Sequence, residues 1–496
     1  MRILLKMFSI SRTCMRSFTH IPAPNRLSLL DCYLGCSQRA AGRWTGISSR
    51  RCLSSVEGQT VPSMLRHLTS KIKATGPITV AEYMREVLTN PVSGYYVKND
   101  MLGAEGDFIT SPEISQMFGE LIGIWCVSEW MAAGKPKAFQ LVELGPGRGS
   151  LTSDILRVFS QLQSALKGAA VSVHLVEVSP KLSQVQAECL AGDHTQVCVS
   201  DEEGVYRTGT TQSGLPVSWY HRVEDVPRGF SIFLAHEFFD ALPIHKFQKT
   251  EKGWREIMVD IDPEAPEKLR FVVFPAPTLA STTLIPADEK REHVEVCPDS
   301  GVIVQKLANR IAVEGGAALI ADYGHDGTKT DTFRGFRGHK LHDVLLAPGT
   351  ADLTADVDFS YLRRMAGDEV VCMGPITQRL FLKNMGIDTR LQVLLRNCRD
   401  ASTHAQLIQS YNMLINPEKM GHRFQFFSLL SHSRMVEPRE EGEGAEEEKE
   451  RQSAAACGWI HSSGIAVRDA ELMCGKMSSG LFRYTMESSN WTCAEK

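Results

Sequence analysis

The chain has 496 residues, of which 43% are hydrophobic and 23% are charged, and its formal net charge at pH 7 is −4. These proportions are typical of a globular protein and exclude the disordered and fibrous classes. No apolar run approaches the roughly 18 residues that a membrane-spanning helix needs. We expect one large α/β domain with insertions and loose ends.

Residues 1–55 form a basic segment. It contains many Arg and Lys residues but a single acid, Asp31, so its charge is about +8. Such a Ser-rich, Arg-rich and acid-poor composition is typical of an import presequence. We therefore expect a transit peptide that directs the chain to the mitochondrial matrix. The alternative is a disordered basic tail that contacts nucleic acid or lipid. The remaining chain would carry roughly −12, so we expect no nucleic-acid partner and no stable membrane insertion.

Helix and strand patterns alternate through the central part of the chain. Helical periodicity is found at residues 80–88 and 114–130. A strong strand, 138–144, runs through a glycine-rich turn into a helix at 150–166, and a second strand follows at 171–176. Further short apolar strands are expected at 230–235 and 317–321. This order predicts a doubly wound, mainly parallel sheet with an N-terminal helical region and with ligands at the carboxyl ends of its strands.

The turn after the first strong strand contains Gly145, Gly147 and Gly149. Glycines let the backbone approach a ligand closely and point a helix N-terminus at it. A dinucleotide-binding loop has the spacing GxGxxG, but Ser150 stands where its third glycine would be. Glu143, just before the turn, would repel a pyrophosphate and could accept hydrogen bonds from an amino-acid ammonium group. S-adenosylmethionine has that group and no phosphate, so we predict it as the cofactor.

Glu177 follows the second strand, where nucleotide-binding folds place an acid that accepts the ribose hydroxyls. The alternative for the turn is a structural Gly-Pro-Gly bend, which the two nearby acids make less plausible. The predicted cofactor-binding residues are Glu143, Gly145, Gly147, Gly149 and Glu177.

A histidine and two acids, His236, Glu237 and Asp240, follow the third predicted strand at the ligand end of the sheet. If the acceptor is a guanidinium, Glu237 and Asp240 could hold its planar fork and position a nitrogen for in-line attack. We predict these two as the catalytic residues. In the alternative, Glu237 caps a helix and Asp240 is solvated. His236 could be a base or a packed ring.

Two other segments are candidates for the acceptor pocket. Residues 106–113 are typical of a loop that enters a capped helix and could close over the cofactor, although capping alone would explain Ser111 and Glu113. Asp322, Tyr323, Gly324 and His325 end a later strand and could also line this pocket. The residues expected to bind the acceptor are Asp107, Ser111, Glu113, His236 and Asp322.

The sequence shows no metal-binding signature. The 13 cysteines include no CxxC pair, so no zinc site is expected. Asp352, Thr354, Asp356 and Asp358 could form a polar loop or a metal site. They lack the Gly and Glu positions of a calcium loop, which favours a solvated, turn-forming segment.

The C-terminal tail, residues 431–496, is atypical. Its acidic, Gly-rich part at 436–450 has almost no large apolar group and cannot offset the entropy of ordering, so we predict disorder there. The remainder has no sustained helical or alternating pattern. The folded domain is therefore expected at residues 62–430.

Four motifs span most of the expected domain: GYYVKNDMLGAEGDFITSPEISQMFGELIGIW (Gly94–Trp125), ELGPGRGSLTSDILR (Glu143–Arg157), HEFFDALPIHKFQ (His236–Gln248) and GTADLTADVDF (Gly349–Phe359). They resemble the motifs of the MidA-like (DUF185) methyltransferases. The resemblance implies a class I, Rossmann-like methyltransferase fold, S-adenosylmethionine as donor, and symmetric dimethylation of arginine. It also implies that the acceptor is a matrix-arm subunit of respiratory complex I, the 49 kDa one, and that the modification serves complex I assembly.

The family's cofactor motif falls on Glu143, Gly145, Gly147 and Gly149, and Glu177 matches its ribose-binding acid. Similarity to the family fades near residue 430. Two alternatives stay open: a non-catalytic assembly scaffold that binds the cofactor, and a small-molecule methyltransferase. Loops set the choice of acceptor, and the cleft motifs are alike in all these enzymes.

Overall fold

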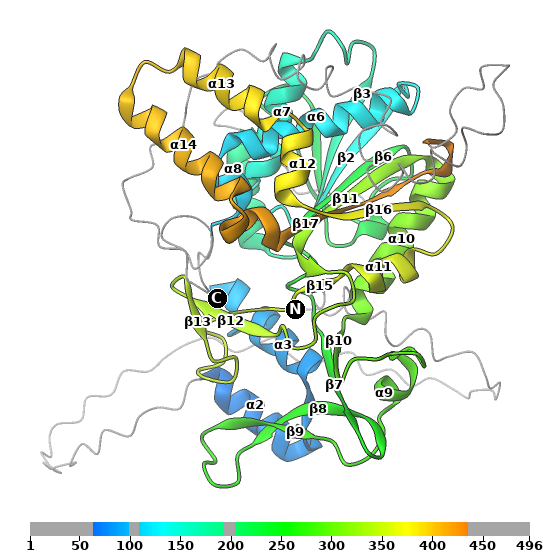
Figure 1. Cartoon of the computed structure of the whole chain (residues 1–496), viewed down its shortest axis with the longest axis vertical. Coiled ribbons are helices and arrows are strands. Elements are labelled where there is room, and N and C mark those ends of the chain that lie inside the picture. The colour runs from blue at the N-terminus through cyan, green and yellow to red at the C-terminus, as the bar shows by residue number, and fades with distance from the viewer. Residues whose placement is uncertain (1–62, 99–108, 192–203, 435–496) are drawn as a thin grey trace, which may run out of the picture.

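The computed structural model describes residues 63–98, 109–191 and 204–434. The predicted transit peptide, Asp107 and nearly all of the predicted C-terminal tail lie outside these residues. The described chain forms two lobes, with a large twisted sheet in the first and smaller antiparallel sheets in the second (Figure 1).

The first lobe is built on a nine-stranded sheet in the order β16-β17-β11-β6-β2-β3-β5-β4, with β15 paired to β11. Its strands are β2 (Ala138–Leu144), β3 (Ala170–Val176), β4 (Val205–Thr210), β5 (Pro216–Tyr220), β6 (Ser231–His236), β11 (Gly316–His325), β15 (Val357–Asp358), β16 (Val371–Thr377) and β17 (Phe424–Leu430). The strands β5, β3, β2, β6 and β11 are parallel, whereas β17 runs antiparallel between β11 and β16. The chain moves outward from β2 to β3 and then returns to β6 on the other side of β2. A crevice therefore opens at the carboxyl ends of β2 and β6.

Helices cover both faces of this sheet, as expected of a doubly wound fold. One face packs against α6 (Gln116–Ala132), α7 (Ser150–Gln161), α8 (Pro180–Ala191), α12 (Gln378–Asn384), α13 (Ile387–Asn397) and α14 (Ala401–Ile415). The other face packs against α10 (Pro298–Glu314) and α11 (Phe359–Ala366). Because strands between two helical layers are buried on both sides, they appear in the sequence as continuous apolar runs.

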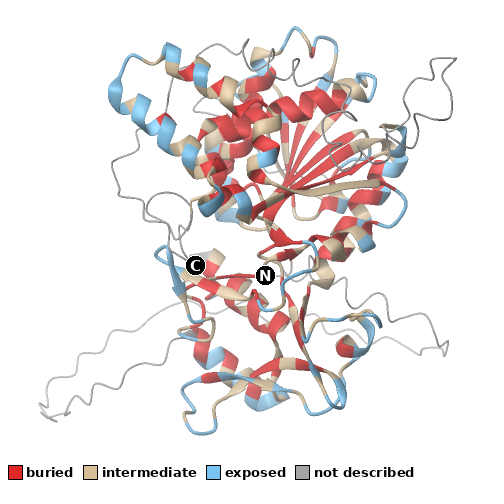
Figure 2. Ribbon diagram, viewed as in Figure 1, coloured by how far each residue is buried: buried red, intermediate tan, exposed pale blue. Residues whose placement is uncertain are grey.

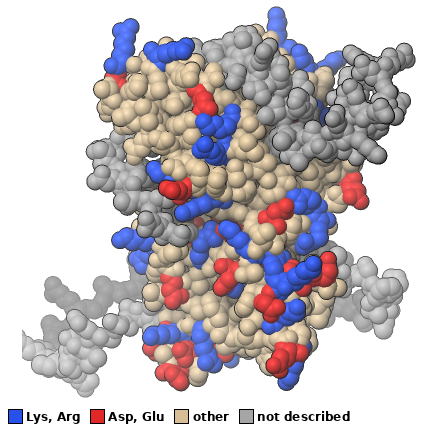
Figure 3. All heavy atoms as spheres, viewed as in Figure 1, with Lys and Arg blue, Asp and Glu red and all other residues tan. Residues whose placement is uncertain are grey.

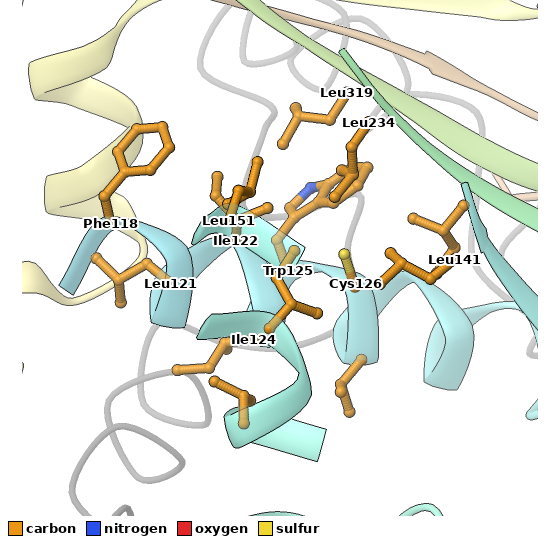
Figure 4. Close-up of a cluster of buried hydrophobic side chains, with 14 of the residues drawn as sticks. Phe118, Leu121, Ile122, Ile124, Trp125, Cys126, Leu141, Leu151, Leu234 and Leu319 are labelled. Atoms are coloured by element: carbon orange, nitrogen blue, oxygen red, sulfur yellow. The ribbon is translucent and has the colours of Figure 1, made fainter. Parts of the chain in front are cut away.

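Helix α6 lies at the centre of the larger core. Its residues from Met117 to Trp130 are all buried, so this helix lacks the polar face that a surface helix shows. Figure 4 shows its side chains meeting Leu141 of β2, Leu234 of β6 and Leu319 of β11. This packing holds α6 and the strands together as one rigid unit. The carboxyl ends of the strands are therefore held in place as well.

The second lobe combines the N-terminal helices with an insertion between β6 and α10 and with residues 334–354, which follow β11. It contains α2 (Ser63–Thr75), α3 (Val80–Thr89), α4 (Tyr95–Lys98), α9 (Leu279–Thr283), β1 (Ile78–Thr79), β7 (His245–Thr250), β8 (Gly253–Ile261), β9 (Leu269–Val273), β10 (His293–Val296), β12 (Arg334–Arg337), β13 (Lys340–His342) and β14 (Asp352–Thr354). A separate buried cluster unites α2, α3 and residues of β8 and β14. The burial colouring shows a core in each lobe (Figure 2). The insertion leaves the sheet at the end of β6, so the second lobe lies beside the carboxyl edge of the main sheet.

The predicted α/β architecture is confirmed. β2 spans the predicted residues, and the ends of β3 and β6 lie within one residue of their predicted positions. α7 ends at Gln161, before the predicted end at residue 166, because the following residues form turns. The antiparallel sheets of the second lobe were not predicted. Within the described ranges, no helix is long and apolar enough to cross a bilayer.

Candidate active site

A cleft of about 550 Å³ lies between the carboxyl edge of the main sheet and the second lobe. The loops after β2, β3 and β6 form one wall. Tyr96 of α4 and Asp352 and Thr354 of β14 contribute from the other side. Residues that are far apart in the sequence are thus brought to one site at the crevice expected from the strand order.

The glycine turn after β2 lines the base of this cleft. Gly145, Gly147 and Gly149 have φ angles of 64°, 55° and 86°, a region that glycine adopts without the steric penalty of other residues. A Cβ atom at position 145 would lie 2.8 Å from Cδ2 of Phe238. Gly145 and Gly147 line the cleft. Gly149 is the N-cap of α7 instead, where its left-handed conformation turns the chain into the helix.

Glu143 is a buried acid at the end of β2, and its residue is 3% exposed. The hydroxyl of Thr152, on the first turn of α7, donates a hydrogen bond to its carboxylate. Burial raises the pKa of Glu143 to about 7, against the lowering effect of the Thr152 hydrogen bond. A cation beside this carboxylate would stabilise its charged form. The geometry therefore suits the predicted contact with an ammonium group.

Glu177 follows β3 and is held in place by two donors. Its Oε1 accepts the backbone N–H of Ser179 at 2.7 Å, and its Oε2 accepts the side-chain amide of Gln186 at 3.0 Å. The same amide nitrogen of Gln186 donates to the carbonyl of Gly147 at 2.8 Å, and Trp219 donates to the Gln186 oxygen at 3.0 Å. Gln186 therefore ties the ribose-binding candidate to the glycine turn. Gln186 was not predicted, since a lone glutamine on a helix carries no motif.

These residues fit S-adenosylmethionine. Two buried carboxylates end adjacent parallel strands, β2 and β3, and a turn with positive φ angles lies between them. One carboxylate can therefore accept hydrogen bonds from an ammonium group and the other from a diol. At Gly145 and Gly147 the backbone between them has no side chain that would block a ligand. We propose Glu143, Gly145, Gly147 and Glu177 as contacts of the cofactor, with Gly149 shaping the turn.

Valine in place of Gly147 should weaken S-adenosylmethionine binding by at least roughly 100-fold, because a β-branched residue at a φ of 55° is strained and its side chain would enter the cleft. Calorimetric titration measures this effect. Gly134→Val is the matched control. Gly134 also has a positive φ, of 84°, but nothing lies within 4 Å of its Cβ position and it does not line the cleft. Equal loss of binding in both variants would contradict a specific role of Gly147.

Cofactor binding should release a proton from Glu143 near neutral pH. Since burial raises its pKa from 4.5 to about 7, the free protein holds Glu143 largely protonated below pH 7 and loses stability as the pH rises toward 7. An ammonium group favours the ionised form, so we expect affinity to fall about tenfold per pH unit below 7. Calorimetry in two buffers of different ionisation enthalpy measures the released proton. Glu143→Gln should abolish the buffer dependence, and a buffer-independent heat in the parent would contradict the assignment.

Glu237 lies directly after β6 and lines the cleft. Its φ is 49°, a left-handed conformation that is unusual for a residue with a side chain. Its Oε1 is buried and has no hydrogen-bond partner among the described residues. Burial, followed by the charges of Asp240 and Glu113, raises the pKa of Glu237 well above its ordinary value. An unpaired, buried carboxylate oxygen in a cleft is suited to bind a cation.

Three further acids, Glu113, Asp240 and Asp352, line the same part of the cleft. Asp240 accepts the hydroxyl of Thr354 at 3.0 Å, and Asp352 accepts the hydroxyl of Tyr96 at 2.8 Å. Burial raises the pKa of Asp240 to about 6. The acidic lining favours a positively charged acceptor group. On the outer face drawn in Figure 3, by contrast, charges of both signs are interspersed.

The His236 ring is packed between aromatic side chains. It meets Phe118 edge-on, with ring centroids 5.0 Å apart, and stacks on Phe424 at 5.8 Å. Burial lowers its pKa to about 3, so the ring is neutral at physiological pH. Its Nε2 lies 3.5 Å from Oε1 of Glu237 without a hydrogen bond. Of the two predicted roles, this environment favours a packed ring beside Glu237 over a base.

The other predicted acceptor-side residues lie in different places. Glu113 lines the cleft, and its carboxylate also accepts the N–H of Thr110 in a capping box. Ser111 is fully buried and donates to Gln378 at 3.4 Å, so it does not line the cleft. Asp322 is also fully buried and lies behind the cleft wall. Asp107 lies outside the described residues.

Of the acids from 352 to 358, one lines the cleft and the other two make structural contacts. Asp352 lines the cleft, whereas Asp356 pairs with Arg334 at 2.5 Å and Asp358 caps α11. Among the described residues, no group of three acids, histidines or cysteines could hold a metal ion. Tyr96 and Tyr323 also line the cleft. Tyr323 belongs to the strand end that was expected to line the acceptor pocket, whereas Tyr96 was not predicted. The signal for Tyr96 is its place in the aromatic start of the Gly94–Trp125 motif.

Comparison with known proteins shows that the chain is similar to methyltransferases. Residues 121–376 match the model of a family described as S-adenosyl-L-methionine-dependent methyltransferases. A zebrafish protein, Protein arginine methyltransferase NDUFAF7, mitochondrial, is 73% identical over 394 residues, which cover 79% of this chain and 92% of the relative. The human protein of that name is 66% identical over 375 residues, covering 76% and 85%.

A solved structure supports the fold. It is that of a COG1565 superfamily member and likely methyl transferase from Burkholderia thailandensis, bound to S-adenosyl-homocysteine. It is 24% identical, aligns with a TM-score of 0.60, and covers 74% of this chain and 92% of its own. The predicted family, fold and cofactor are confirmed. The chain belongs to the MidA-like family of S-adenosyl-L-methionine-dependent methyltransferases.

Proposed function

We propose that this enzyme methylates arginine side chains of a protein. The observation that carries the proposal is the buried Oε1 of Glu237, which has no hydrogen-bond partner among the described residues and lies near three further acids that line the cleft. A guanidinium is planar and always charged, and it presents paired N–H donors that match a carboxylate. The relatives named as protein arginine methyltransferases support the same acceptor.

In the proposed reaction, Glu237 and Asp240 hold the guanidinium and aim one nitrogen into the cleft. S-adenosylmethionine supplies an electrophilic methyl group bonded to its sulfonium sulfur. A nitrogen–carbon bond forms as the sulfur–carbon bond breaks, and the guanidinium loses one proton. A bound guanidinium favours the ionised form of Glu237, and because the pKa of this group is raised, its carboxylate is a suitable acceptor for that proton.

We further propose that the acceptor is the 49 kDa matrix-arm subunit of complex I, that the product is symmetric dimethylarginine, and that the modification serves complex I assembly in the mitochondrial matrix. The motif resemblance supports the acceptor, and the basic segment 1–55 supports the compartment. The relatives are named as mitochondrial proteins.

The direct test is transfer of a labelled methyl group to the purified 49 kDa subunit, with mass spectrometry to locate the methylated residue. We expect label on an arginine as symmetric dimethylarginine, and none when that arginine is changed to lysine. Transfer to a small molecule instead would contradict a protein acceptor. Cofactor binding and partner binding without any transfer would favour an assembly scaffold.

A further inference from the structure

The turn that carries the proposed acceptor residues has an unusual backbone. Glu237 is in the left-handed region, with a φ of 49°, and its N–H donates to the carbonyl of Ala321 at 3.0 Å. Such a conformation persists where the surrounding structure holds it in place.

Three consecutive N–H groups after Glu237 converge on one oxygen. Oδ2 of Asp322 accepts the N–H groups of Phe238, Phe239 and Asp240 at 3.2, 2.9 and 3.3 Å. Successive backbone donors that point inward form a concave site for an anion. Here the anion is a side chain of the protein itself. These donors would be left unsatisfied inside the protein without it.

The second oxygen of Asp322 binds the backbone of the next residue in β11. Oδ1 accepts the N–H of Tyr323 at 2.9 Å, and Tyr323 lines the cleft. Asp322 itself is fully buried and does not line the cleft. One carboxylate therefore anchors the turn with Glu237 and Asp240 and also the adjacent end of β11.

We propose that Asp322 is a positioning residue for the acceptor site, which acts by holding Glu237 in its strained conformation. The inference rests on the proposed function of Glu237 and corrects the expected contact of Asp322 with the acceptor. Asn at this position keeps the shape but has one accepting oxygen. Its amide group would face either the three N–H donors or the N–H of Tyr323, so one set of hydrogen bonds must be lost.

The first arm of the test is hydrogen exchange of the backbone amides in parent and Asp322→Ala, which removes both accepting oxygens. We expect the amides of Phe238, Phe239 and Asp240 to lose protection while those of β2 and β6 keep it. This measurement does not depend on activity, so it decides whether Asp322 holds the turn even if arginine proves not to be the acceptor. Unchanged protection of the three amides would overturn the proposal.

The second arm measures methyl transfer, with Glu295→Gln as the matched control. Glu295 is another buried carboxylate that accepts consecutive backbone N–H groups, those of Thr332 at 2.9 Å and Phe333 at 3.1 Å, and it does not line the cleft. We expect Asp322→Asn to lower kcat/KM for the acceptor by roughly tenfold or more, with cofactor affinity changed less than about threefold. Both variants should lose some thermal stability. An equal loss of kcat/KM in both would reduce Asp322 to a structural role and overturn the proposal. A parent that transfers no methyl group to arginine would refute the proposed function and leave the exchange result to decide the turn.

Discussion

Glutamine in place of Glu237 should lower the rate of methyl transfer by at least about 100-fold, because the variant loses both the charge that holds the guanidinium and the proton acceptor. Cofactor affinity should not change, since Glu143 and Glu177 lie on other strands. Single-turnover kinetics with labelled cofactor measure the rate, and calorimetry measures the affinity. A variant that kept half of the parental rate would refute the role of Glu237.

The same substitution should raise stability, which separates lost function from a damaged fold. The pKa of Glu237 is raised in the folded protein, so ionisation of this group destabilises the fold as the pH rises through that raised value. Glutamine removes this penalty, and Tm at pH 8 should exceed that of the parent. Glu113→Ala is a control from the same cleft. It removes the carboxylate that accepts the N–H of Thr110, so we expect lower stability and a smaller loss of transfer.

The cofactor side could be predicted from local sequence because its chemistry follows the strands directly. Glu143 and the glycine turn are contiguous, and Glu177 ends the next strand, so the β-α-β order alone places them together. The apolar runs of β2, β3 and β6 predicted the sheet for the same reason. Buried parallel strands are apolar throughout.

The acceptor side was harder to predict because it is assembled from distant segments. Tyr96 meets Asp352, Thr354 meets Asp240, and these contacts depend on a second lobe whose short antiparallel strands carry weak patterns. Asp322 shows the limit most clearly. The sequence places an acid at a strand end, where both a ligand contact and a backbone anchor are possible, and only its contacts with residues 238–240 decide between them.

Stability should depend most strongly on a buried ion pair between α6 and α13. Arg390 donates to both carboxylate oxygens of Glu120, at 2.8 and 3.0 Å, and both side chains are 1% exposed. Methionine in place of Arg390 would leave Glu120 buried with Arg157 at 4.0 Å as its nearest remaining cation in the described ion pairs. We expect a loss of about 3–5 kcal/mol in the free energy of unfolding and a fall in Tm of roughly 10 °C.

Chemical denaturation of three variants would show whether burial causes this effect. Lys383→Met breaks a neighbouring pair with Asp388 in which the side chains are 31% and 48% exposed, so its cost should be about 1 kcal/mol or less. Replacing both members of the buried pair, as in Glu120→Leu with Arg390→Met, removes the uncompensated charge and should recover most of the loss, because the two positions are strongly coupled. If the double variant were as unstable as the sum of the single ones, lost packing at the α6–α13 contact, and not the unpaired charge of Glu120, would explain the destabilisation.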